Sequence, residues 1–424
     1  MIKTLKVIAF ISFTACCSLA LAGGPLVLEG PNGNTPVTYL IPSIMVHVES
    51  GDLNAEVDNA AANAILLEAL QLWNDVNTST IELTINTAAL LLEPDIDSRN
   101  FDQYIPSIDG SIFNGDDGLN PIVYDSDGEI IDAFFGEGAS DHTVGFSASI
   151  YTLGGSFFNE GYAVINGKDL GTLGLTDTEF KLLIAHEIGH FFGLDHSQTN
   201  INNQETIFGT PVICDTSTPE NYPVMYPFIC RETESLHADD VSALTALYPE
   251  TNVNDNFGIL EGRFTDASGN AILGANIWAE NTSTAEAYSI VSDYLKQGTG
   301  YYKLLLPAGR YTLHANSINP IFNGGSSIGP YAFSIFDASF TSPHPISEVV
   351  YQGEVESNGE VITITTGQSV NISFSLAGLA VTASPDENDN VSDLFGATSY
   401  VTLLLLISLL ITTRTITVKR HEQY

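Results

Sequence analysis

The sequence predicts an α+β domain, followed by a separate all-β domain and a C-terminal apolar helix. Residues 54–76 carry apolar side chains at helical spacing, whereas residues 81–85 alternate between apolar and polar types, as strands do. After Pro249 the composition shifts, and from Ile259 short alternating runs are separated by turn residues. A chain of 424 residues is long enough for two or three domains. We therefore predict a domain boundary near residue 250.

The charge balance argues against one class of function. The formal net charge is −38, from 51 acidic and 13 basic residues. Nucleic-acid binding requires a basic surface that neutralises phosphates, so nucleic acids are not expected partners. We interpret the acidity as a solvated surface rather than as an acidic binding patch.

Residues 1–22 are predicted to be a secretory signal peptide. Two lysines precede an apolar run, residues 7–19, and residues 20–22 form a small-x-small cleavage site. A lipoprotein signal is the alternative, in which Cys16 or Cys17 would carry the lipid. The residues before these cysteines match that signal poorly. The sequence therefore predicts export.

The next segments predict the first strands and the first helix. Residues 23–36 are rich in Gly, Pro and Asn and are expected to form an extended lead segment. Strand-like runs follow in residues 37–48, before the helix of residues 54–76. Trp73 lies at a core position of this helix, and such a residue is more often buried than part of a ligand site. Residues 162–166 form a further short strand.

The region of residues 94–145 is acidic and loop-rich. Asp125 and Asp127 stand at alternate positions before Gly128, and Asp132 follows. Carboxylates with this spacing beside a glycine suit a calcium ion. Only a fragment of the EF-hand pattern is present, and no flanking helices are predicted. A structural calcium site and a polar turn are the two interpretations of this segment.

Residues 186–196, with the sequence HEIGHFFGLDH, carry the strongest chemical pattern. His186 and His190 are four apart, so on a helix both rings lie on one face and can bind one zinc ion, while Glu187 can reach the water beside it. Ten residues after His186, His196 would lie about 15 Å along a continuous helix, so the helix must end and the chain must double back. Gly193 can take the positive φ that such an end needs. The alternative, a buried helix that carries histidines by chance, is disfavoured by the register.

Helix-start residues flank this pattern. Thr176 and Glu179 have the spacing of a capping box for the helix that carries the histidines. Apolar residues supply the buried face of that helix, which leaves the two histidines towards a cleft. Asp239 and Asp240 begin the next predicted helix, where carboxylates are favourable.

Three segments resemble the metzincin peptidases and, within them, the matrixins. They are the HExxHxxGxxH pattern of residues 186–196, Pro-Val-Met-Tyr-Pro in residues 223–227 and Leu-His-Ala-Asp-Asp in residues 236–240. The resemblance covers the predicted domain of residues 37–250. It implies a twisted mixed sheet with three main helices, a catalytic zinc ion and hydrolysis of protein substrates. It also implies that Met225 forms a hydrophobic floor beneath the metal, that the two aspartates support this methionine turn, and that an acidic loop holds structural calcium.

Removal of the signal peptide would leave two cysteines, Cys214 and Cys230. In an exported protein such a pair predicts a disulfide, which would close a loop that contains Met225. A cysteine-ligated zinc is the alternative, but three histidines already provide a ligand set.

The all-β domain is predicted to span residues 258–378, after a linker of residues 251–257. Residues 262–266, 269–275 and 306–311 resemble the carboxypeptidase-regulatory or transthyretin-like β-sandwich. Such modules are not catalytic, so the resemblance implies a supporting or docking role.

The C-terminal end predicts membrane attachment. After an acidic linker, residues 379–393, the segment 394–413 has no charge and as a helix would span about 30 Å, the thickness of a bilayer core. The basic tail, residues 414–424, would then lie in the cytoplasm. One alternative is a sorting tail that is later removed, since the strongly apolar part, residues 401–411, is short for an anchor. A buried helix of the preceding domain is another.

Together these patterns predict a secreted or surface-attached zinc metalloendopeptidase that acts on proteins or peptides. His186, His190 and His196 would hold zinc, and Glu187 would act as general base. The main alternative is a surface adhesin with a relic metal site. Glu187 argues against it, because a structural zinc needs no general base. A non-peptidase metallohydrolase is a third interpretation.

Overall fold

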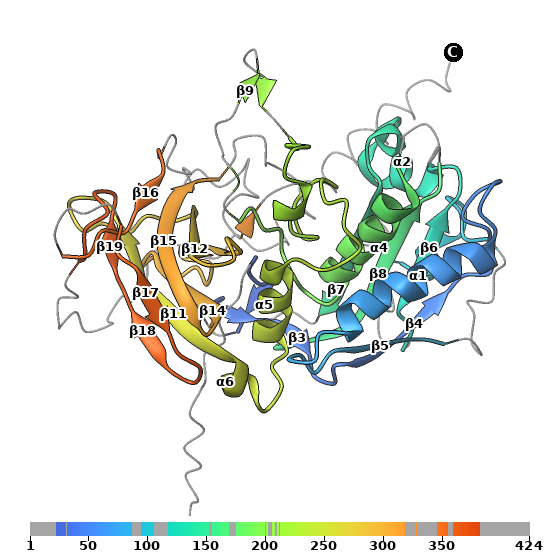
Figure 1. The fold of residues 1–424 in the computed structure, drawn as a ribbon. Coiled ribbons are helices and arrows are strands. Elements are labelled where there is room, and N and C mark those ends of the chain that lie inside the picture. The colour runs from blue at the N-terminus through green and yellow to red at the C-terminus, as the bar shows by residue number, and fades with distance from the viewer. Residues whose placement is uncertain are drawn as a thin grey trace, which may run out of the picture.

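A computed structural model describes residues 23–381, apart from residues 31, 87–94, 106–117, 152–154, 169–174, 200, 202–205, 208–209, 212, 319–327, 330–345 and 355–358. The predicted signal peptide, apolar C-terminal segment and basic tail lie outside the described residues. Within the part that is described, no helix is long and apolar enough to cross a membrane. The described chain forms a mixed α/β region followed by a region built on two further sheets (Figure 1).

The α/β region is built on a mixed sheet with the strand order β3-β8-β6-β4-β5, to which β7 adds by pairing with β8. The pairs along this order are parallel, whereas β7 runs antiparallel to β8. A mixed sheet was predicted, and it is present. The strands are β3 (Thr38–Tyr39), β4 (Ser43–Val48), β5 (Glu82–Ile85), β6 (Pro121–Asp125), β7 (Gly145–Tyr151) and β8 (Phe157–Asn166).

Alternation along β6 sends its side chains into two cores. Ile122 and Tyr124 belong to the main core, whereas Val123 between them belongs to a second cluster on the other face. Helices α1 (Asn59–Asn74) and α4 (Asp177–Phe191) contribute to the main core, and α2 (Glu129–Phe135) contributes to the second cluster (Figure 1). The sheet is therefore covered on both faces.

Helix α1 begins later than predicted, because two residues compete to cap it. The Asp58 side chain accepts a hydrogen bond from the Ala61 N–H at 2.9 Å and is the N-cap. Asn54, the predicted start, instead accepts from the Val57 N–H at 2.8 Å and makes a turn. An Asx turn of this kind keeps the chain out of the helix until residue 59.

The second region contains two sheets, with the orders β14-β11-β18 and β13-β12-β15-β16; β19 pairs with β11 and β17 with β15. Residues from both sheets share one core, as a sandwich requires. The strands are β11 (Phe257–Thr265), β12 (Ala275–Asn281), β13 (Ala287–Val291), β14 (Tyr301–Pro307), β15 (Gly309–Ser317), β16 (Val349–Val350), β17 (Ile362–Ile364), β18 (Ser369–Asn371) and β19 (Phe374–Ser375).

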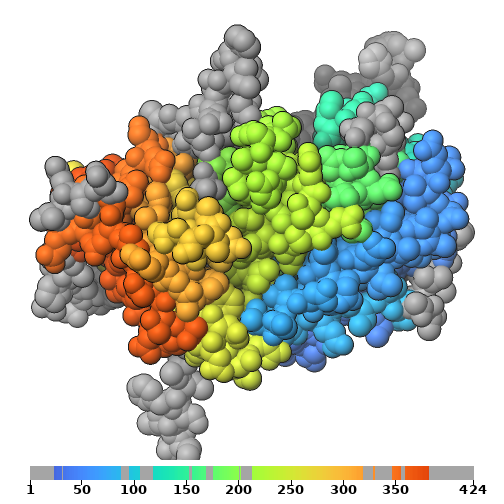
Figure 2. Space-filling view, in the orientation of Figure 1, coloured from blue at the N-terminus to red at the C-terminus, as the bar shows by residue number. Residues whose placement is uncertain are grey.

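The two regions, predicted to be separate, pack directly against each other. The predicted linker contains α6 (Val253–Asn256), and β11 begins at the buried Phe257. Helix α5 (Ala238–Leu247) lies between the regions, and its Ser242 hydroxyl donates to the Leu305 carbonyl of β14 at 2.6 Å. One buried apolar cluster continues from the first region into the second. Figure 2 shows the green and yellow segments in contact with both the blue and the orange ones.

Four smaller strands form two separate pairs, and a backbone bridge beside one pair ties the lead segment to the fold. β1 (Leu28–Glu29) and β2 (Thr35–Pro36) form a hairpin, and β9 (Thr206–Ile207) pairs with β10 (Thr210–Pro211). Just before β1, Pro25 forms a bridge with Leu194, immediately after α4. The lead segment of residues 23–36 is therefore held against the end of the α4 helix.

Candidate metal centre

Helix α4 carries the first two histidines and is fixed by a capping box and by burial. The Thr176 side chain accepts from the Glu179 N–H, and the Glu179 carboxylate accepts from the Thr176 N–H at 2.7 Å. This confirms the predicted start of the helix. His186 and His190 follow on one face, and each is 9% exposed. The imidazoles therefore sit in the interior rather than on an open surface.

The helix ends as the sequence requires. Gly193 has a φ of 102°, and a Cβ at this position would lie 2.7 Å from a ring carbon of Phe158. Only glycine fits both the left-handed backbone and the tight space. The Leu194 N–H still donates to the Gly189 carbonyl at 3.0 Å, and the chain then reverses. This reversal brings His196 back beside the helix.

The three imidazoles meet through their Nε2 atoms. The Nε2 of His190 is 3.0 Å from that of His186 and 3.0 Å from that of His196, and the remaining pair is 3.2 Å apart. Three nitrogens bound at about 2.1 Å to one tetrahedral ion would lie roughly 3.4 Å apart. Among the described residues, this trio is the group of His, Cys, Asp or Glu side chains that could hold a metal ion.

Hydrogen bonds to carbonyl groups show that two of these nitrogens carry no proton. The Nδ1 of His186 lies 2.7 Å from the Val224 carbonyl, and that of His190 lies 2.8 Å from the Leu194 carbonyl. A carbonyl only accepts, so each Nδ1 must be the donor, and in the neutral ring each Nε2 then bears a lone pair. Two lone pairs that face each other at 3.0 Å are unfavourable unless a cation lies between them. The donor set therefore fits a metal ion.

Burial keeps these histidines neutral, as metal ligands must be. Burial lowers the pKa of His186 to about 4, although the hydrogen bond to Val224 opposes this shift. The pKa of His190 is also lowered, by burial first and then by the neighbouring His196 and His186. Protons therefore do not compete for these nitrogens near neutral pH.

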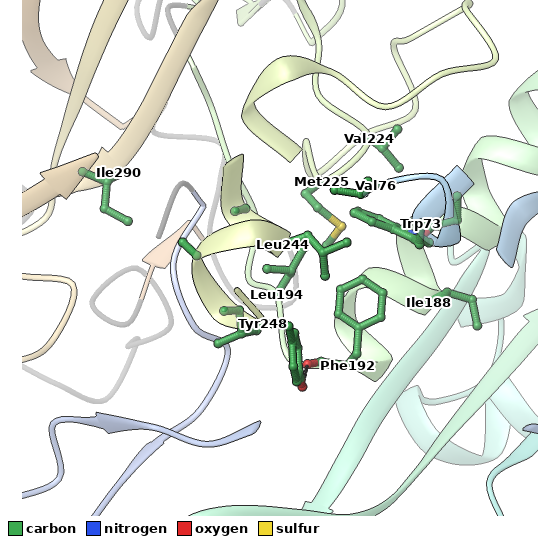
Figure 3. Close-up of a cluster of buried hydrophobic side chains, with 14 of the residues drawn as sticks. Trp73, Val76, Ile188, Phe192, Leu194, Val224, Met225, Leu244, Tyr248 and Ile290 are labelled. Carbon is green, nitrogen blue, oxygen red and sulfur yellow. Dashed lines mark hydrogen bonds between the residues drawn. The ribbon is translucent and has the colours of Figure 1, made fainter. Parts of the chain in front are cut away.

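Met225 lies in a buried apolar cluster against α4, and its role as the floor of a metal site stays a prediction. Figure 3 shows its side chain beside Trp73 and Leu244, and all three are buried. A Cβ on Gly189 would collide with the Met225 sulfur, so the glycine in HEIGH allows this close packing. The Trp73 indole N–H donates to the Ala185 carbonyl at 2.9 Å, which ties α1 to the helix that carries His186 and His190.

Asp240 supports the methionine turn from below. Its carboxylate accepts from the Val224 N–H at 2.8 Å and from the Met225 N–H at 3.0 Å. The carbonyl of the same Val224 accepts from the Nδ1 of His186. The aspartate therefore fixes the turn that orients a metal-ligating ring, an arrangement of the kind that tunes metal sites.

Glu187 is buried beside the centre. Its side chain lies against Gly145 of β7, where a Cβ would come within 3.2 Å of the Glu187 Cγ. Burial raises the pKa of Glu187 to about 8, and a hydrogen bond from Ser147 partly offsets the rise. A raised pKa of this kind is common among carboxyl groups at functional sites.

The predicted disulfide between Cys214 and Cys230 is confirmed. The two Cα atoms are 5.3 Å apart, and the bond encloses the methionine turn. Both cysteines belong to a cluster that also contains Tyr222, Tyr226 and Val291 of β13. The disulfide therefore lies where the turn meets the second region.

The three aspartates of the calcium hypothesis are not brought together as a ligand group. Asp125 is buried, and its carboxylate accepts from the N–H groups of Ile130 and Ile131 at 3.2 and 2.9 Å. Asp132 lies within α2, where it accepts from the Ser140 N–H at 2.8 Å. The absence of flanking helices was also predicted wrongly, because α2 follows Gly128 directly. Calcium binding by Asp125, Asp127 and Asp132 stays a prediction.

A second set of polar residues beside the centre was missed by sequence reasoning. Thr199 has a φ of 53°, which is a strained value for a β-branched residue and costs about 1–3 kcal/mol. Its backbone N–H and carbonyl are bound by Ser289 and Asn276 of the second region. These partners are far away in the sequence and belong to no motif, so no local signal marks them.

Comparison with known proteins adds no relative. No protein-family description matches the chain, and no curated protein matches it. The resemblance to metzincins therefore stays with the motif residues named above. What the structure adds to it is the meeting of three histidines within metal-binding distance in a mixed α/β fold.

Proposed function

We propose that the protein is an exported zinc-dependent endopeptidase. The observation that carries the proposal is the convergence of three buried imidazole Nε2 atoms, with Glu187 directly after the first histidine. Neutral imidazoles suit zinc, whereas calcium and magnesium prefer carboxylate and carbonyl oxygens. Three ligands from the chain leave a position open, which is typical of catalytic rather than structural zinc.

In this proposal some residues of the chain bind the metal ion, others orient its ligands, and one transfers a proton. His186, His190 and His196 hold the ion, and the carbonyl groups of Val224 and Leu194 orient the first two rings. When bound, zinc supplies Lewis-acid chemistry, because it polarises a peptide carbonyl and makes water more acidic. Glu187 would take a proton from the attacking water and pass it to the departing amine.

One experiment tests both the chemistry and the location. Cells that express the intact chain are separated into medium, membrane and soluble fractions, and each fraction is assayed with casein, with and without a zinc chelator. We expect chelator-sensitive cleavage in the medium or the membrane fraction. Glu187→Gln should retain zinc and lose activity by roughly 10²–10⁴-fold, the usual contribution of a general base.

Glu56→Gln is the matched control, because Glu56 is exposed and far from α4 in the sequence. It should keep both zinc and activity. Cleavage that resists the chelator, or a Glu187→Gln variant as active as Glu56→Gln, would refute the peptidase assignment. A chain that binds zinc but cleaves nothing would favour the adhesin.

A further inference from the structure

The third histidine is held differently from the first two. His186 and His190 are positioned by the backbone of α4, whereas His196 lies beyond the helix end on a reversed segment. The residue after it, Ser197, is fixed through its N–H, which donates to the Met225 carbonyl at 2.9 Å. The contacts of the residues that follow, up to Thr199, determine how firmly His196 is held against the other two rings.

The second region contributes several of the bonds that hold this segment. The Ser197 hydroxyl donates to the Asp239 carboxylate and lies 3.0 Å from the Ser289 hydroxyl of β13. The Ser289 hydroxyl also accepts from the Thr199 N–H at 3.0 Å. The Asn276 side chain of β12 donates to the Thr199 carbonyl at 2.6 Å. Both backbone groups of Thr199 are thus bound by the second region.

The backbone at Thr199 shows why this hold matters. A φ of 53° on a β-branched residue is not adopted without support from the surroundings. All the groups involved are buried: Thr199 is 0% exposed, Ser289 2% and Asn276 1%. Water therefore cannot replace these bonds, and their loss would let the segment that carries His196 relax.

We propose that Ser289 and Asn276 are positioning residues for His196, so that the metal centre is incomplete without the second region of the chain. The inference rests on the metal site of the proposed function. It assigns the second region a role at the centre instead of the separate supporting or docking role that the β-sandwich resemblance implies.

The chain offers a closely matched control for Ser289. Ser292 lies just beyond the same strand and is also buried, and its hydroxyl also makes two hydrogen bonds. It donates to the Ile272 carbonyl at 2.7 Å and accepts from the Ala275 N–H at 3.0 Å. Both partners lie within the second region. Ser289→Ala and Ser292→Ala therefore remove equivalent bonds, but only the first touches the segment after His196.

Ser289→Ala also leaves the docking of β13 intact. The Ser289 N–H donates to the Asp239 carboxylate at 2.6 Å, and this backbone bond survives the substitution. A change at the metal centre in this variant would therefore come from the lost hydroxyl rather than from separation of the two regions.

The test uses the full chain and measures metal binding rather than peptidase activity. Zinc affinity is measured by competition with a chromophoric chelator, the coordination geometry from the visible spectrum of cobalt(II)-loaded protein, and stability from thermal unfolding. Both alanine variants should lower the unfolding temperature. Ser289→Ala should raise the zinc dissociation constant roughly 10-fold or more, as loss of a group that supports a ligand usually does, and should change the cobalt spectrum. Ser292→Ala should leave both at the parent values.

Equal zinc affinity and identical cobalt spectra in the two variants would overturn the inference and leave Ser289 with a purely structural role. If Ser289→Ala does not fold, Asn276→Ala is compared with Ser292→Ala by the same criteria. A parent chain that binds no zinc would overturn both this inference and the proposed function. A parent that binds zinc without hydrolysing peptides would refute the proposed function alone.

Discussion

Two sites in the molecule bring together side chains of types that can bind metals, and they differ in how the lone pairs of these side chains are satisfied. At the metal centre, three imidazoles converge, and two of them direct lone pairs at each other. In the acidic region, a cavity of about 330 Å³ is lined by Asp95, Asp97, Arg99, Asp125, Ser126, Asp127 and Glu129, together with Ile96. Four of its five carboxylates already have partners. Asp97 pairs with Arg99, Asp125 accepts two backbone N–H groups, Asp127 accepts from the Glu129 N–H, and Glu129 accepts from a serine hydroxyl.

The difference shows that the number of potential ligands does not define a metal site. What matters is whether the protein satisfies their lone pairs itself. At the acidic cavity, backbone donors and a guanidinium do so. At the histidine trio, hydrogen bonds to backbone carbonyl groups hold the proton of His186 and of His190 on Nδ1. The Nε2 lone pairs of these neutral rings then face inward, where a cation can bind them.

The largest expected effect is the loss of the metal after removal of one imidazole. His190 is the member of the trio that lies 3.0 Å from both others. His190→Ala should therefore reduce bound zinc from about one ion per chain to near zero, measured by elemental analysis after dialysis. The exposed His142 is the control, and His142→Ala should retain zinc. Full zinc content in His190→Ala would show that the histidine trio does not bind zinc, and the contrast with the acidic cavity would be lost.

Another buried histidine extends the comparison. His237 is 9% exposed, like His186, but its Nδ1 accepts from the Asp239 N–H at 3.1 Å and caps α5. Its lone pair is satisfied by the protein, so His237→Asn should keep zinc. Asparagine is also a good N-cap, so stability at pH 7 should change by about 1 kcal/mol or less.

The same variant tests the pH dependence. Burial lowers the pKa of His237 from 6.5 to about 3, with a smaller effect of Arg231. The unfolded chain therefore binds a proton that the folded chain refuses, and stability falls as the pH drops from 6.5 towards 3. Between pH 7 and pH 5, the parent should lose about 2 kcal/mol more than His237→Asn. Urea unfolding of the metal-free proteins measures this difference, and parallel losses would contradict it.

The smallest expected effect belongs to the acidic cavity. The calcium hypothesis predicts that calcium raises the unfolding temperature of the zinc-loaded chain, whereas carboxylates that are satisfied within the protein predict no change beyond about 1 °C. A rise that Asp127→Ala abolishes would instead support the calcium hypothesis and would make the acidic region a second cation site. Arg99→Ala removes the cationic residue among those that line the cavity, so it should increase any response to calcium.

The parts of the centre that could be predicted from sequence are local. Glu179 caps its helix three residues from Thr176, Gly193 ends the helix within one turn of His190, and two cysteines in an exported chain have one possible pairing. Each of these features depends on a few neighbouring residues. Their physical causes are therefore visible in a short stretch of sequence.

The parts that could not be predicted depend on competition or on distance. Asn54 and Asp58 are both good helix-start residues, and only the packed structure decides between them. Helix α2 begins at Glu129 after the N-cap Gly128, whose left-handed φ of 81° is not part of any helix-start pattern. The bonds from Ser289 and Asn276 to Thr199 join residues of unremarkable type across the two regions. No periodicity or motif in the sequence predicts such contacts.

The bond between Thr199 and Ser289 has a consequence for the order of biosynthesis. The two residues are 90 positions apart, so the N–H of Thr199 has no hydroxyl acceptor until β13 has been made. At a typical elongation rate of about 5–20 residues per second, this interval lasts roughly 5–18 s. Throughout it, the helix that carries His186 and His190 can already be complete. If Ser289 positions His196 as proposed, the newly made chain fixes its third histidine only after β13 has been made.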